Sequence, residues 1–205
     1  MRDPLFRNDQ AVHMMDSHIK PVNELVDRFI GLDDRGWMPY VAPIHGGTKA
    51  RVLSVLRDPG PKTRTEGGSG FLCVENDDPT AESQAELFVR FGIEASDVLP
   101  WNAYPWYINR APTAAELEAG ASVLIELLPL LPVLRVILLQ GRDAAAGWRR
   151  VATKAPKLVG DKDLMVVECI HPSRQALWTS DPMVRQQRLD QRDAAYASVA
   201  GALAK

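Results

Sequence analysis

The sequence is poor in the features that mark secreted, membrane-spanning and metal-cluster proteins. Its two cysteines, Cys73 and Cys169, have no Cys-x-x-Cys spacing, so cysteine alone builds neither a zinc site nor an iron-sulfur cluster. The first residues lack the apolar core of a signal peptide. The longest apolar run, residues 123–139, is interrupted by two prolines and two charged residues, so it falls short of the roughly 20 residues that cross a bilayer. We therefore expect a cytoplasmic protein with reduced, buried thiols and no membrane partner.

Neither sign of charge dominates the chain. With 24 basic and 26 acidic residues the formal net charge is -2, so a nucleic-acid partner would have to meet a local basic patch. A length of 205 residues is enough to bury one sizeable core. We predict a monomer with a single domain over residues 1–205: a helical segment and connector at 1–50, a core at 51–176 and a C-terminal helix at 177–205.

Four apolar runs alternate with segments of helical periodicity. The runs are rich in aliphatic and β-branched residues, which is typical of strands buried on both faces. They cover residues 52–57, 97–102, 134–141 and 164–170, and the helical segments cover 81–91, 113–131, 142–151 and 182–204. Because parallel neighbours need helical crossovers, this order predicts a three-layer α/β/α sandwich with a central four-stranded parallel sheet.

The remaining segments are less regular. Residues 10–30 have helical spacing broken by a proline, which predicts two short helices or one kinked helix. Residues 33–49 are a connector rich in glycine and proline. Thr80 is a candidate cap for the helix over 81–91, with Ser83 as a competing cap, and residues 113–116 form a capping-box pattern at the start of the next helix.

Polar side chains follow three of the four predicted strands. Asp58 lies in an Asp-Pro-Gly-Pro turn after the first strand, Asn102 ends the second, and His171 follows the fourth. The carboxyl ends of parallel strands share one edge of a sheet, where ligands of open α/β sheets bind. Asp before Pro-Gly is also common turn chemistry. The convergence of the three residues favours a functional site.

These residue types suit the cleavage of an N-glycosidic bond. The amide of Asn102 offers one donor and one acceptor to an imide-like edge, and the ring of Phe71 can stack on a planar heterocycle. His171 can donate to a carbonyl oxygen whose negative charge grows as the bond to the ring nitrogen breaks. Asp58 can orient a water or stabilise a cationic sugar.

The same stretches resemble the motifs of the uracil-DNA glycosylase superfamily, in the right order from residue 51 to residue 176. The sequence His-Pro-Ser at 171–173 matches a family motif outright. In the best-known family the first motif reads Gly-Gln-Asp-Pro-Tyr-His, and here Leu-Arg-Asp-Pro-Gly-Pro at 56–61 occupies that place. Three further stretches are similar to family landmarks: residues 68–74 to its aromatic run, 101–113 to its asparagine strand and the Asn-Arg-x-Pro-Thr segment, and 136–142 to the strand that follows.

The resemblance implies a role for each matching residue. Asp58 would activate water or stabilise the oxocarbenium ion, Phe71 would stack on the base, Asn102 would read uracil, and His171 would donate to the uracilate. Ser173 would contact a phosphate. We expect Lys62, Ser69 and Arg174 to join Ser173 in contacting DNA.

Two departures from the family pattern affect the pocket and the wedge. Gly60 stands where a tyrosine blocks the thymine methyl in the best-known family, so we expect Gly60 to line a roomier base pocket. The mismatch-specific branch has Asn-Pro-Gly there, which makes the present motif a hybrid of two branches. After His-Pro-Ser, the usual Pro-Leu-Ser wedge is replaced by residues 174–176, with Leu177 next. The cysteines of the iron-sulfur branches are absent, so no cluster is expected.

The sequence therefore predicts a monofunctional DNA glycosylase of base excision repair. Its substrate would be DNA containing uracil or another deaminated base, which it would flip out of the stack. No metal and no cofactor are expected. Two alternatives remain open: a non-catalytic nucleic-acid-binding protein with the glycosylase fold, and an α/β enzyme acting on free nucleosides or nucleotides.

Overall fold

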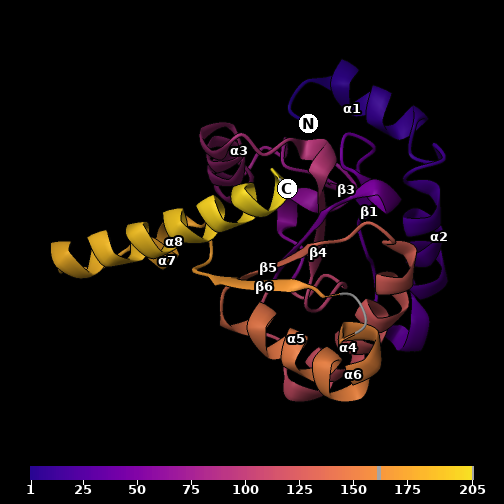
Figure 1. Ribbon diagram of the computed structural model, residues 1–205. Helices are drawn as coiled ribbons and strands as arrows, with labels where there is room; N and C mark the ends of the chain where they lie inside the picture. Colours follow the sequence, from indigo (N-terminus) through magenta and orange to yellow (C-terminus); the bar gives the residue numbers. More distant parts are fainter. Residues whose placement is uncertain (161–162, 205) are drawn as a thin grey trace.

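The computed structural model, which describes residues 1–160 and 163–204, is built on a four-stranded parallel sheet in the order β4-β2-β5-β6 (Figure 1). The central strands are β2 (Val52–Leu56) and β5 (Val136–Gln140). The edge strands are β4 (Val98–Asn102) and β6 (Met165–Cys169). All three pairings are parallel, which confirms the predicted sheet.

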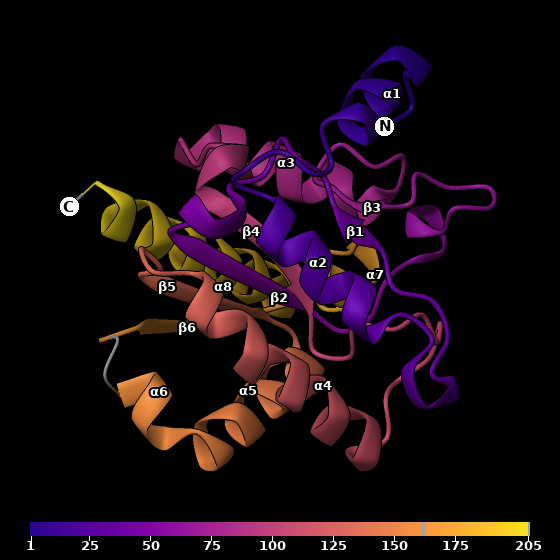
Figure 2. The ribbon, with the colours of Figure 1, turned by 90° about the vertical axis from the view of Figure 1, so that its right-hand side faces the viewer.

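Helices cover both faces of this sheet and complete three layers. One face carries α2 (Lys20–Phe29), α4 (Ala114–Leu127) and α5 (Arg142–Lys154). The other carries α3 (Pro79–Phe91) and α8 (Pro182–Leu203). Figure 2 shows α2 in front of β2 and α8 behind it. The predicted α/β/α sandwich is confirmed.

Alternate side chains of β2 enter the two cores. Leu53 and Val55 pack in the cluster that includes α2, α4 and α5, whereas Val52 packs in the cluster that includes α3 and α8. Period-two alternation puts successive residues on opposite faces of a strand. Because both faces are covered by helices, both sets are mostly apolar, and Ser54 is the polar exception in this strand.

Smaller elements surround the sandwich. A two-stranded parallel pair joins β1 (Tyr40–Val41) to β3 (Phe71–Leu72), so the predicted connector over 33–49 contains a short strand. The chain also forms α1 (Pro4–Val12), α6 (Pro156–Gly160) and α7 (Arg174–Leu177). Short 3-10 helices lie at Leu32–Asp34, Gly47–Lys49, Pro61–Thr63, Ala95–Asp97 and Leu128–Leu130. The segment 10–30 therefore holds the end of α1 and the whole of α2.

Two helix boundaries show where capping rules succeed and fail. The capping box of Thr113 and Glu116 opens α4 as predicted. In α3, however, Asp78 caps the helix in place of Thr80: its carboxylate accepts hydrogen bonds from the backbone N–H groups of Thr80 at 2.9 Å and Ala81 at 3.0 Å. Asp caps a helix at least as well as Thr does. Because Asp78 precedes Thr80 in the sequence and is the cap, α3 begins at Pro79.

The two cysteines of the chain are buried thiols. Cys73 and Cys169 are free and buried, and burial raises the pKa of each thiol to about 12. None of the helices within 1–160 and 163–204 is long and apolar enough to traverse a bilayer.

Candidate active site

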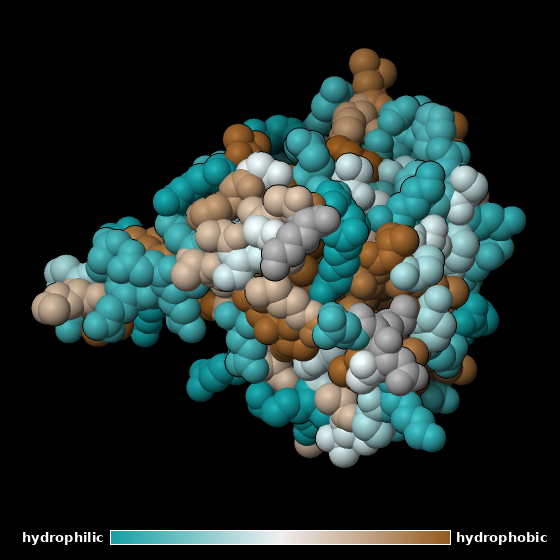
Figure 3. Space-filling model, viewed as in Figure 1, coloured by the Kyte–Doolittle hydropathy of each residue, from teal (hydrophilic) through white to brown (hydrophobic). Residues whose placement is uncertain are grey.

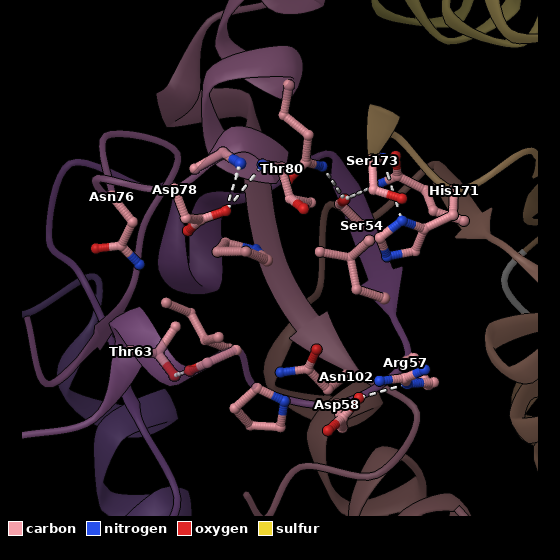
Figure 4. Close-up of a pocket in the computed structure, with 18 of the residues that line it drawn as sticks. Ser54, Arg57, Asp58, Thr63, Asn76, Asp78, Thr80, Asn102, His171 and Ser173 are labelled. Carbon is pink, nitrogen blue, oxygen red and sulfur yellow. Dashed lines mark hydrogen bonds and ion pairs between the residues drawn. The ribbon is translucent and has the colours of Figure 1, made fainter. Parts of the chain in front are cut away.

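A cavity of about 730 Å³ opens at the carboxyl edge of the sheet. The three residues predicted from the strand ends, Asp58, Asn102 and His171, all line it. Figure 4 shows Asp58 and Asn102 at one end of the cavity and His171 with Ser173 on another wall. The structure therefore brings together groups that are far apart in the sequence.

Asp58 is a carboxylate held in a nearly dry position. Its side chain is 4 % exposed, and the Nε–H of Arg57 donates a hydrogen bond to its Oδ1 at 2.5 Å. Burial raises the pKa of Asp58, and this effect outweighs the opposing effects of Arg57 and of a hydrogen bond from the backbone of Asn109. A carboxylate with a raised pKa is a better proton acceptor when ionised, which suits a general base.

Backbone hydrogen bonds fix Asp58 beside Asn102. The register of β2 and β4 pairs Leu56 with Asn102. Beyond the strands, the N–H of Ala103 donates to the carbonyl of Leu56 at 2.8 Å, and the N–H of Tyr104 donates to the carbonyl of Arg57 at 3.0 Å. The two strand ends are thus joined past the sheet, and their polar side chains emerge into the same cavity.

Asn102 has an unused hydrogen-bond donor. The residue is 1 % exposed, and its Nδ2 has no hydrogen-bond partner among the residues that the structure describes. A buried amide N–H without a partner costs free energy comparable to that of a lost hydrogen bond. Because Asn102 lines the cavity, an acceptor on a bound ligand would satisfy this donor.

His171 is arranged as a neutral donor. Burial is the chief cause that lowers the pKa of His171, and the nearby positive charge of Arg57 adds to it. The backbone N–H of Ser173 donates to Nδ1 of His171 at 3.2 Å, so a neutral ring carries its proton on Nε2. The ring packs against Gly141, whose φ of 99° only glycine adopts readily.

The opposite wall comes from residues that the sequence analysis did not assign to the site. Asn76, Asp78 and Thr80, around the start of α3, line the cavity (Figure 4). Sequence offered only a signal for a helix cap there, and capping is what Asp78 does. Asn76 donates from Nδ2 to the carbonyl of Phe71 at 2.8 Å, and its Oδ1 has no partner within the described part of the chain.

A buried polar network forms a further part of the lining. Ser54 accepts hydrogen bonds from Nε2 of Gln140 at 2.8 Å and from Nε2 of Gln84 at 3.4 Å. Tyr196 donates its hydroxyl to Oε1 of Gln140 at 2.9 Å. Ser54 and Gln140 are polar residues inside apolar strands. That anomaly was the signal that sequence reasoning passed over.

The position expected for Phe71 needs a correction. Its ring is 5 % exposed and packs in a separate cluster with Met1, Ala42 and Cys73. The ring does not line the main cavity, whereas Leu72 does. In the two-residue strand β3 neighbouring side chains point to opposite faces, so Phe71 faces the N-terminal segment and Leu72 faces the site.

The other predicted residues divide between two surfaces. Gly60 and Ser173 line the main cavity, and a Cβ built on Gly60 would meet no atom within 4 Å. Lys62 and Ser69 line a different hollow beside α1. Arg174 is exposed and pairs with Glu82 of α3 at 3.2 Å. The structure thus does not bring the four predicted DNA contacts into one place.

Metal ligands do not gather in the described ranges. No group of three or more His, Cys, Asp or Glu side chains there is arranged to hold a metal ion. The cavity instead presents a carboxylate, a carboxamide and an imidazole, which are groups for proton transfer and hydrogen bonding.

Fold and cavity define an α/β protein with a polar cavity at the carboxyl edge of a parallel sheet, which is where open α/β sheets bind their ligands. The family model of the Uracil DNA glycosylase superfamily matches residues 45–198. The chain belongs to this superfamily. A comparison with curated proteins finds no match. Membership supports glycosylase-type hydrolysis with DNA as the partner at the level of the family.

Proposed function

We propose that the protein is a monofunctional DNA glycosylase that removes uracil or another deaminated base in base excision repair. The observation that carries the proposal is the buried, unpartnered Nδ2 donor of Asn102 in the same cavity as Asp58 and a neutral His171. A carbonyl oxygen on a deaminated base would accept from this donor. An exocyclic amino group in its place would leave the donor unsatisfied, which gives the site a basis for discrimination.

The chemistry follows from the protonation states. As the N-glycosidic bond breaks, its electron pair moves to the ring nitrogen, and negative charge spreads to the base carbonyls. The Nε2–H of His171 and the Nδ2–H of Asn102 stabilise that charge. Water attacks C1′ of the sugar and one of its protons passes to Asp58, which releases it to solvent, while the departing base anion takes up a proton from solvent. The products are free base and an abasic site.

The cavity lining supports two further features of the proposal. No lysine lines the cavity in the described part of the chain, so water is the nucleophile rather than an amine that would form a Schiff base. The open space beside Gly60 leaves room next to the base. A methyl group on the base therefore meets no steric block there, and we propose that thymine in a mismatch enters the pocket as well.

The test measures base release from oligonucleotides that carry one uracil, hypoxanthine, xanthine or mismatched thymine, in single and double strands. Purified protein should leave an alkali-labile abasic site at uracil. Asp58→Asn and His171→Ala should each lower the rate by about 100-fold or more, because each removes a group that acts in the transition state. Asp16→Asn and His13→Ala, which change exposed residues of the N-terminal segment, serve as matched controls and should keep the full rate.

Three outcomes would contradict the proposal. Full activity in both Asp58→Asn and His171→Ala would show that the reacting groups lie elsewhere. Tight binding of uracil-containing DNA by the wild-type protein without any release of base would identify a binding protein, and turnover of free deoxyuridine without a polymer would identify a nucleoside enzyme.

A further inference from the structure

Trp178 is an aromatic side chain left in solvent next to the cavity. It is 78 % exposed, and it directly follows α7, whose residues Gln175 and Ala176 line the cavity. The backbone N–H of Trp178 donates to the carbonyl of Gln175 at 3.2 Å. The backbone of Trp178 therefore lies within one short turn of the cavity lining, and its indole takes no part in the core clusters formed by the described residues.

The backbone that carries Trp178 is held by a side chain of α8. Nη1 of Arg188 donates to the carbonyl of Trp178 at 2.8 Å and to the carbonyl of Ala176 at 3.1 Å. A charge-assisted bond to two carbonyls restrains the segment. Because the main chain is already restrained, binding through the ring requires the ordering of the side chain but not of the backbone.

The same side of α8 carries a free positive charge. Arg185 precedes Arg188 by three residues, so the two side chains share one face of the helix. Arg185 is exposed, and no carboxylate pairs with it among the residues described. Figure 1 shows this end of α8 projecting beyond the body of the molecule, and Figure 3 shows the projection covered mostly by hydrophilic side chains.

We propose that Trp178 and Arg185 form a binding surface for unpaired DNA that continues from the cavity mouth. The indole would stack on a base beside the one held in the cavity, and Arg185 would meet the phosphate backbone. This inference rests on the proposed function for its substrate, because the strand it holds is the one whose base enters the cavity. It adds that the substrate is bound with its flanking bases unstacked.

Charge and shape favour a nucleic acid over a protein partner. Residues 174–192 contain four arginines and two aspartates. Two of these arginines are paired with carboxylates, Arg174 with Glu82 and Arg192 with Asp193. Arg188 is held by two backbone carbonyls, so Arg185 is the cation of this segment that has no carboxylate partner among the described residues. Trp178 is followed by Thr179, Ser180 and Asp181, which do not extend an apolar patch. The other large apolar side chain exposed on this segment is that of Met183, at the start of α8. A flat ring beside an unpaired arginine suits base stacking with phosphate contacts, which together bind single strands without sequence preference.

The test is the binding of a fluorescently labelled 20-mer of deoxyadenosine, which contains no base that the proposed reaction removes. Trp178→Ala should weaken binding about tenfold, whereas Trp178→Phe should stay within about threefold of the wild type because phenylalanine also stacks. Arg185→Gln should reduce the slope of log affinity against log salt by about 0.7, the value for one phosphate contact on a single strand. Leu5→Ala and Arg149→Gln change exposed residues of α1 and α5 and serve as controls.

The outcome separates this inference from the glycosylase proposal. Loss of binding in Trp178→Ala supports the surface even if no base is ever released, and base release with unchanged binding in that variant overturns the surface alone. Equal affinities of Trp178→Ala and Leu5→Ala would overturn it. A dimer that dissociates in Trp178→Ala, seen by sedimentation with no change in DNA affinity, would assign the ring to a second copy of the chain instead.

Discussion

Asp58 combines a functional advantage with a cost to stability. Burial raises its pKa, which means that the folded protein disfavours the ionised carboxylate relative to the unfolded chain. Arg57 offsets part of this cost through the hydrogen bond at 2.5 Å. At neutral pH the ionised form is therefore less stabilised in the folded state, while the same dry environment strengthens its electrostatic action on a sugar cation.

Phe71 and Leu72 are neighbours with different tasks, and their substitution should separate stability from activity. Leu72→Ala removes an aliphatic surface from the cavity, so we expect kcat/KM for uracil release to fall about tenfold. Phe71→Ala opens a hole in the cluster with Met1 and Cys73, so we expect the free energy of unfolding to fall by about 3 kcal/mol. Activity per folded molecule should change little in that variant.

Urea unfolding and kinetics at saturating and low substrate measure the two effects. The opposite pattern would show that the ring of Phe71 reaches the base. In that pattern Phe71→Ala would lose kcat/KM while its free energy of unfolding stayed normal, and Leu72→Ala would keep the kcat/KM of the wild type.

At the scale of elements, the strand ends could be predicted and the opposite wall could not. Strands buried on both faces appear as apolar runs, so Asp58, Asn102 and His171 were recognisable as the polar residues that follow them. The strand β3 has only two residues. A strand of two residues is too short to show an alternation of apolar and polar side chains, so the sequence could not predict on which face of β3 the ring of Phe71 lies.

The wall at the start of α3 escaped prediction for a different reason. Asp78 is fully explained locally as a helix cap, and a residue with a local explanation gives no sign of where the helix lies in the fold. The position of α3 is set by its packing against α8 and the sheet. That packing depends on contacts between residues far apart in the sequence.

Two helices approach the site closely at Ala103, the residue after Asn102. A Cβ built on Gly120 of α4 would lie 1.8 Å from the carbonyl oxygen of Ala103, and one on Gly147 of α5 would lie 3.0 Å from its Cβ. The obstacle at Gly120 is backbone, which cannot rotate away. The absence of a side chain there thus permits α4 to pack against the loop that follows Asn102.

Gly120→Ala should therefore both destabilise the fold and disturb the site. We expect the free energy of unfolding to fall by about 2 kcal/mol from overpacking, and base release to fall more than that of a variant equally destabilised elsewhere. Gly201→Ala in α8 is the matched control, since its Cβ would meet nothing within 4 Å. Alanine should stabilise that helix by about 0.5 kcal/mol. Equal thermal stability of both variants would contradict the close approach at Ala103.

For the whole molecule, His45 joins segments that enclose the site. Its Nδ1–H donates to the carbonyl of Ala95 at 3.3 Å, and its Nε2 accepts from the N–H of Val74 at 3.1 Å. The ring is 1 % exposed and lines the cavity. Both ring nitrogens are used by the neutral form, so a proton on Nε2 would break the bond to Val74.

Acid should consequently destabilise the protein before its carboxylates are protonated. Burial lowers the pKa of His45 from 6.5 to about 4. At pH values between 4 and 6.5, His45 is therefore protonated in the unfolded chain but neutral in the folded protein. The stability is complete above pH 6.5 and is lost as the pH falls toward 4, by an amount on the order of 3 kcal/mol. Urea unfolding at half-unit pH intervals measures this slope.

His45→Gln can still donate and accept one hydrogen bond but does not titrate, so the wild type should lose more stability than the variant between pH 6.5 and pH 4. Parallel curves for the two proteins would show that His45 is protonated in the folded state.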